Sequence, residues 1–107
     1  MTKPENSSPY GQIGDLCYYK EGPMRCIVEI KQQSIKDNIR YMTVEVKASI
    51  THGGPAIMPI GTLLKPSCRI GYEDYPFAFS MQRVKAYTPK DAVAQVDKHG
   101  MFQWVYT

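Results

Sequence analysis

The sequence has no long hydrophobic run and few cysteines. No stretch approaches the roughly 18 apolar residues that span a bilayer, so we expect no membrane segment. The first eight residues carry one lysine without an apolar run behind it, so a secretory signal is not expected. Cys17, Cys26 and Cys68 cannot all pair within one chain, and they lack the close spacing of a zinc site. These absences predict a soluble cytoplasmic protein with reduced thiols and no bound metal.

Catalytic and cofactor-binding motifs are also scarce. The segment His52-Gly53-Gly54 is faintly similar to an oxyanion-hole loop of ester hydrolases, but the sequence has no Gly-x-Ser-x-Gly nucleophile elbow. His99 precedes a glycine, where a helix-end role is the simpler interpretation. No phosphate loop or dinucleotide fingerprint is present. We therefore predict neither an enzyme nor a cofactor.

The length and composition fit one small globular domain. The chain has 107 residues, of which 43% are hydrophobic and 21% charged, and its formal net charge is +3. Residues 1–12 are rich in Pro, Ser, Asn and Gly and predict a flexible leader. Residues 13–107 then form a single β domain.

Strand signals recur along most of this domain. Apolar residues alternate with polar ones in two long segments, with Ile27 as an exception, and this period of two is typical of strands with one solvent-facing side. Shorter aromatic or β-branched segments predict further strands. The predicted strands cover residues 15–19, 24–31, 42–50, 62–65, 81–87 and 101–107. Residues 67–80 are left open between a strand and a loop that packs its own aromatic side chains.

The two long segments predict an antiparallel hairpin whose register can be inferred from charge. Opposite charges across a pair stabilise it, which favours Glu29 facing Lys47 and Lys31 facing Glu45. This register places Val28 opposite Ala48 and Ile30 opposite Val46, with the bend at Asp37-Asn38-Ile39. A slip by two residues keeps the same faces but loses the charge matching, and is the main competitor.

One helix is predicted near the C-terminal end. Thr88 suits the N-cap, Pro89 the first helical position and Asp91 the first turn, while Gly100 can end the helix. Together with five or six strands, this predicts a small SH3-like barrel or a strongly bent antiparallel sheet with one short C-terminal helix. The Gly14-Asp15 turn, the long hairpin and residues 60–64 are loosely similar to SH3-like barrels.

Two binding functions are compatible with such a domain. The first is a non-enzymatic binding or small regulatory module that docks on another protein, because residues 56–60 are unusually apolar for a loop rich in Gly and Pro. Its candidate contact residues are Ile57, Met58, Ile60, Tyr72, Tyr75 and Phe77. The alternative is nucleic-acid binding by basic and aromatic side chains. Its candidates are Tyr18, Tyr19, Lys20, Arg25, Arg83 and Lys85.

Overall fold

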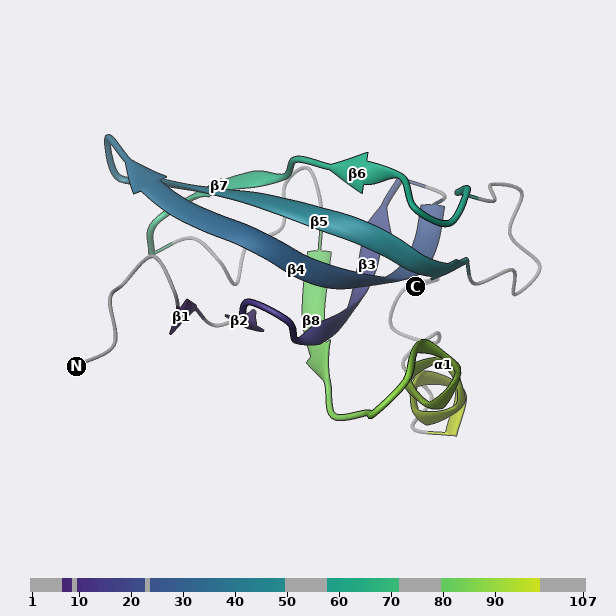
Figure 1. The fold of residues 1–107 in the computed structure, drawn as a ribbon. Helices are drawn as coiled ribbons and strands as arrows, with labels where there is room; N and C mark the ends of the chain where they lie inside the picture. Colours follow the sequence, from purple (N-terminus) through teal and green to yellow (C-terminus); the bar gives the residue numbers. More distant parts are fainter. Residues whose placement is uncertain (1–6, 9, 23, 50–57, 72–79, 99–107) are drawn as a thin grey trace.

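The computed structural model describes residues 7–8, 10–22, 24–49, 58–71 and 80–98. These residues form mainly β structure with one short helix (Figure 1). The elements are β1 (Ser7–Ser8), β2 (Gly11–Gln12), β3 (Leu16–Glu21), β4 (Met24–Lys36), β5 (Ile39–Ser49), β6 (Leu63–Leu64), β7 (Ser67–Arg69), β8 (Ser80–Val84) and α1 (Pro89–Lys98). The predicted C-terminal strand at residues 101–107 lies outside the described residues. No described helix is long and apolar enough to cross a membrane.

Six of the strands form one antiparallel sheet, and β1 and β2 form a small separate ladder. The order in the large sheet is β6-β5-β4-β3-β8. Both β6 and β7 pair with the same edge of β5: β7 pairs with its first three residues, and β6 pairs with residues further along it. Among the described residues the sheet is open, because neither β6 nor β7 pairs with β8. The sequence therefore predicted the mainly antiparallel sheet and the helix correctly, whereas the closed barrel is not observed.

The sheet bends strongly along β4, its longest strand. The first half of β4 pairs with β3, and pairing with β5 continues to the far end of the strand. Figure 1 shows β3 and β8 running steeply across the direction of the long β4–β5 hairpin. The β4–β5 ladder shifts register twice, between Ile27 and Val28 and between Ile30 and Gln32. Such bulges add twist and bend a strand, so they account for the sharp turn of the sheet.

The predicted hairpin register is wrong. Val28 faces Val46 rather than Ala48, and Ile30 faces Val44 rather than Val46. The bend is a tight turn with Asp37 and Asn38 in left-handed conformations, as in a type I′ turn, so Lys36 pairs with Ile39.

The two-residue length of that turn explains why the hairpin contains bulges. A two-residue turn without a bulge would set Ile30 opposite Glu45, an apolar side chain against a charged one. Lys31 is the extra residue on β4, and its insertion brings Ile30 opposite Val44 instead. Lys47 is the extra residue on β5, beyond which Ile27 faces Ala48. The hairpin therefore keeps its apolar pairs through two lysine bulges.

Both faces of the sheet carry a hydrophobic core, although the sequence predicted one solvent-facing side. The larger core lies on one face and contains ten buried side chains: Tyr10, Cys17, Tyr19, Met24, Cys26, Val28, Ile30, Met42, Val44 and Val46. On the other face α1 covers Tyr18, Ile27 and Val84 with Ala92 and Val96. Ile27, the exception to the alternation, is fully buried under this helix. The prediction of a wet face is thus wrong for the part of the sheet beneath α1.

The predicted start of the helix is confirmed. The backbone N–H of Asp91 donates to Thr88 Oγ1 at 3.1 Å, and the N–H of Ala92 donates to the Thr88 carbonyl at 3.0 Å. Thr88 is therefore the N-cap and Pro89 the first helical residue, as their side chains favour. The predicted stop at Gly100 lies outside the described residues.

Part of the predicted leader belongs to the packed structure. Tyr10 is only 4% exposed and lies in the larger core, where its carbonyl accepts a hydrogen bond from the Cys17 thiol. The Gly11 carbonyl accepts a hydrogen bond from Gln33 Nε2 at 3.1 Å. Tyr10 and Gly11 are thus held against the larger core and against β4.

Candidate functional site

The nucleic-acid candidates on β3 and β4 are mostly buried. Tyr18 lies in the core beneath α1, and Tyr19 lies in the larger core, where its hydroxyl donates to Glu21. Arg25 is 6% exposed, and its guanidinium donates to the carbonyls of Gly22 and Met24, which holds the β3–β4 turn together. These three side chains are buried, so they present little surface for stacking or phosphate contact, and nucleic-acid binding stays a prediction. Lys20 is half-buried at the end of β3.

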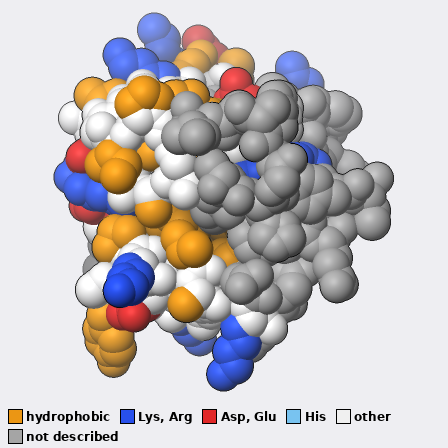
Figure 2. Space-filling view, turned by 90° about the vertical axis from the view of Figure 1, so that its right-hand side faces the viewer, with side chains coloured by type: hydrophobic (Ala, Val, Ile, Leu, Met, Phe, Trp, Pro, Cys, Tyr) orange, Lys and Arg blue, Asp and Glu red, His pale blue; other side chains and the backbone are white. Residues whose placement is uncertain are grey.

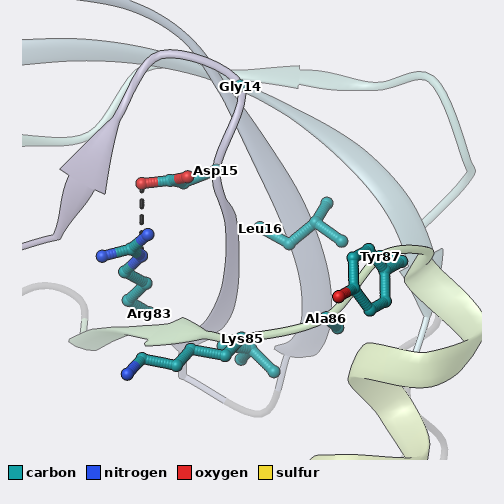
Figure 3. A pocket seen from close by; sticks show the side chains of 8 residues that line it. Gly14, Asp15, Leu16, Arg83, Lys85, Ala86 and Tyr87 are labelled. Carbon is teal, nitrogen blue, oxygen red and sulfur yellow. Dashed lines mark ion pairs between the residues drawn. The ribbon is translucent and has the colours of Figure 1, made fainter.

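The two remaining candidates of that set, Arg83 and Lys85, are exposed and line one pocket. Arg83 Nε lies 3.2 Å from the Asp15 carboxylate. Figure 3 shows this ion pair at the opening between the start of β3 and the end of β8. The structure therefore brings Arg83 and Lys85 together with a segment that the sequence analysis did not select.

The candidates for protein docking divide between described and undescribed residues. Met58 is half-buried against the larger core, and its carbonyl accepts a hydrogen bond from the Ser49 hydroxyl. Ile60 is 72% exposed. The other four, Ile57, Tyr72, Tyr75 and Phe77, lie outside the described residues. Of the described candidates, Ile60 thus presents the most apolar surface to solvent.

A tight turn holds Ile60 in a fixed position on the central hairpin. The Thr62 N–H donates to the Pro59 carbonyl at 3.2 Å, and Gly61 has a φ of 94°, as in a type II turn. The Gly61 N–H donates to the Val46 carbonyl at 2.8 Å, and the Val46 N–H donates to the Thr62 carbonyl at 2.9 Å. Ile60 occupies the second position of this turn, so its exposed side chain is carried by backbone bonded to β5.

Leu63, which follows this turn, is a candidate contact residue that the sequence analysis missed. It is 57% exposed and pairs with Glu45 at the edge strand β6. Neighbouring strand residues point to opposite faces, so Leu63 and Leu64 cannot both enter the core. That rule was available from the sequence. We call Ile60 and Leu63 together the β6 apolar patch. On this side of the molecule Figure 2 shows hydrophobic side chains at several places on the described surface.

Four charged side chains form a neutral cluster on the β4–β5 ladder, and one of them, Glu45, is the cross-strand partner of Leu63. Glu29 and Glu45 face each other directly, which is unfavourable for like charges. The bulged Lys31 lies 3.3 Å from each carboxylate, and the bulged Lys47 lies 3.5 Å from Glu29 and 3.2 Å from Glu45. The predicted pairs Glu29–Lys47 and Lys31–Glu45 thus exist as ion pairs, although the residues are not directly opposite. We call these four residues the charge cluster.

The electrostatics of the charge cluster argue against phosphate binding. Hydrogen bonds from Lys47 and Lys31 hold the pKa of Glu45 below its usual value. Hydrogen bonds to Glu29 and Glu45 raise the pKa of Lys31. Each lysine lies within ion-pair distance of both carboxylates, so the formal charges of the cluster cancel and both lysines are engaged.

The buried thiols have no reactive character. Burial raises the pKa of Cys17 and that of Cys26 to about 12, and nearby carboxylates add to the effect. Since the thiolate is the nucleophile and the metal ligand, these two side chains act as small hydrophobic groups, as the sequence predicted. None of the three cysteines forms a disulfide, and no group of metal-ligating side chains occurs within the described ranges.

Comparison with known proteins adds no relative. No protein family, no curated protein and no solved structure matches this chain.

Proposed function

We propose that this protein is a non-enzymatic binding module that docks on another protein through the β6 apolar patch. The observation that carries the proposal is the exposure of Ile60 and Leu63, 72% and 57%, on backbone that is hydrogen-bonded to β5. Fully burying an isoleucine or leucine side chain contributes about 1.5–3 kcal/mol. A contact surface whose backbone is already ordered loses little conformational freedom on binding.

The position of Leu63 at a sheet edge supports the same proposal. Within the part of the chain described, β6 pairs with β5 only. Exposed sheet edges accept partner strands through main-chain hydrogen bonds, and apolar side chains beside the edge provide specificity. A small regulatory protein of the cytoplasm is the role that we propose for such a module, since none of its three cysteines forms a disulfide. The SH3-like barrel remains a hypothesis that suits this mode of binding.

Nucleic-acid binding is the alternative, and the disposition of the basic side chains counts against it. Arg25 and Arg40 are buried, each 6% exposed. Lys31, Lys47 and Arg83 form ion pairs with carboxylates. Phosphate binding requires cations that gather on one accessible surface. Lys85 and the exposed part of Arg83 are the described cations that best support this alternative.

An affinity capture with matched variants tests the proposal. The baits are the wild-type chain, Ile60→Ser, Leu63→Ser and the control Ile13→Ser, which changes an isoleucine that is 52% exposed on the β2–β3 turn. We expect wild type and the control to retain the same proteins from an extract of the cells that make the chain, with or without nuclease. The β6 variants should lose those proteins while keeping thermal midpoints within a few degrees of wild type.

Two outcomes would contradict protein docking at this patch. One is retention of the same proteins by Ile60→Ser and Leu63→Ser. The other is loss of all retained proteins after nuclease, together with salt-sensitive binding of oligonucleotides in fluorescence anisotropy, which would establish the nucleic-acid alternative.

A further inference from the structure

A pocket of about 290 Å³ opens between the β2–β3 turn, the end of β8 and the segment that leads into α1. It is distinct from the β6 apolar patch and from the charge cluster. Figure 3 shows its two sides, with Asp15 and Arg83 on one and Leu16, Ala86 and Tyr87 on the other. The lining residues are Gly14, Asp15, Leu16, Arg83, Val84, Lys85, Ala86 and Tyr87.

The charged side of the pocket presents a positioned guanidinium. Asp15 Oδ2 accepts the Gln12 N–H at 2.7 Å, which fixes the carboxylate within the β2–β3 turn. The same oxygen lies 3.2 Å from Arg83 Nε. Asp15 engages Nε, and within the described residues no ion pair occupies the two terminal nitrogens of Arg83, whose side chain is 52% exposed. A guanidinium presented in this way suits bidentate contact with a carboxylate or a phosphate.

Lys85 adds a second positive charge to this side. It is exposed and lines the same pocket. With Arg83 and Lys85 against Asp15, the lining carries one net positive charge. A single anionic group on a ligand would balance it.

The opposite side of the pocket offers an aromatic ring. Tyr87 is fully exposed, although tyrosine rings normally bury most of their apolar area. Leu16 and Ala86 are half-buried beside it. A flat apolar group could therefore stack on Tyr87 while its polar end reaches Arg83.

We propose that this pocket binds a small aromatic ligand that carries one oxyanion, either a carboxylate or a phosphate. The oxyanion contacts Arg83 and Lys85, and the ring packs between Leu16 and Tyr87. Small-molecule sites usually measure about 300–1,000 Å³, so a pocket of this volume accommodates a single ring with its anionic group rather than a dinucleotide. This site is independent of the protein docking proposed above.

Titration of the ¹⁵N-labelled full chain by NMR tests the proposal, with phenyl phosphate and benzoate as probes. We expect at least one probe to bind saturably, with the largest amide shifts at Gly14, Leu16, Arg83, Ala86 and Tyr87. The probe that binds more tightly identifies the oxyanion. Inorganic phosphate and phenol, which each lack one half of the ligand, should bind at least tenfold more weakly than the better probe.

Matched variants distinguish the pocket from general charge attraction. Arg83→Gln and Tyr87→Ala should each weaken binding of the better probe at least tenfold. Lys36→Gln removes an exposed lysine at the hairpin tip, and Tyr41→Ala removes a tyrosine that is 43% exposed on β5. Neither control should change the affinity more than twofold.

The proposal is overturned if neither probe saturates, if the shifts centre elsewhere, or if Lys36→Gln weakens binding as much as Arg83→Gln. Spectra of each variant without ligand report whether the fold is retained. Ile60→Ser should leave probe binding unchanged, so failure of the docking proposal would not affect this test.

Discussion

Burial sets the chemical character of individual residues in this protein. Arg25 is placed among backbone carbonyls that accept its hydrogen bonds, and it therefore maintains a turn instead of meeting a ligand. Cys17 and Cys26 lie in an apolar core, where the neutral thiol is favoured over the thiolate. Cys68 is only partly buried, on β7. The three cysteines should therefore differ in reactivity.

At pH 8 we expect a disulfide reagent such as DTNB to label Cys68 rapidly in the native protein and to leave the two buried thiols unmodified. Cys68→Ser should abolish rapid labelling, and denaturant should restore two reactive thiols. Rapid native labelling of the Cys68→Ser variant would contradict this assignment.

The raised pKa values of Cys17 and Cys26 predict that the protein loses stability at alkaline pH. A raised thiol pKa stabilises the fold fully below the pKa of the unfolded thiols, near 8.5. This contribution falls as the pH rises from there towards about 12, where Cys17 and Cys26 ionise in the folded protein.

At the scale of elements, the β4–β5 hairpin combines a two-residue turn with apolar cross-strand pairs because a lysine is bulged out of each strand. The bulges set Glu29 against Glu45, and the same two lysines neutralise both carboxylates. Bulge and charge pattern therefore depend on each other, because Glu29 and Glu45 face each other across the ladder and only the two bulged lysines neutralise them among the described residues.

The double variant Lys31→Gln, Lys47→Gln tests this dependence. We expect the pKa of Glu45 to rise, because the two hydrogen bonds that lower it are lost. In wild type, a lowered carboxyl pKa contributes stability above the unfolded pKa of about 4.3, and this contribution is lost as the pH falls through the folded pKa. The stability deficit of the double variant relative to wild type should therefore shrink between pH 7 and pH 3, because wild type loses this contribution as the pH falls through the folded pKa of Glu45.

Titration of the Glu45 carboxyl carbon by NMR and urea unfolding at both pH values measure these effects. Lys36→Gln, at an exposed position beside the turn, is the control and should titrate like wild type. An unchanged Glu45 pKa in the double variant would show that the lysines do not act on it.

At the scale of the whole molecule, β3 and β4 join the two cores. Tyr18 and Ile27 face α1, while Tyr19 and Cys26 beside them in the chain face the larger core. A strand buried on both faces transmits loss of packing from one core to the other. The described sheet and helix should therefore unfold as one cooperative unit.

Val44→Ala in the larger core and Val96→Ala in the helix core test this coupling. Both valines are fully buried, so each substitution should destabilise the protein by about 2–3 kcal/mol. In urea unfolding, the amide signals of β5 and of α1 should share one midpoint in each variant, and Ile13→Ala should change the free energy by less than about 0.5 kcal/mol. Loss of the α1 signals in Val96→Ala at a urea concentration that leaves β5 intact would refute a single unit.

The sequence by itself determined the local structure of this protein. Alternation predicts β4 and β5, because a strand turns successive side chains to opposite faces. Thr88, Pro89 and Asp91 predict the helix start, because their preferences act within one turn of backbone. The apolar content of residues 56–60 also selected Ile60 as a candidate, but only the structure separates the exposed Ile60 from Met58, which packs against the larger core.

Only the tertiary structure decided the register, the second core and the pocket. The register of the β4–β5 hairpin depends on where bulges allow apolar side chains to pack on both faces of the sheet. Charge pairing across the ladder contributes too little free energy to set the register. Tyr18 became a core residue because α1, about 70 positions further along the chain, packs over it. The pocket joins Asp15 to Arg83, and no local pattern encodes a contact between residues so distant in sequence. Such long-range contacts arise only when the strands and the helix pack together in the folded chain.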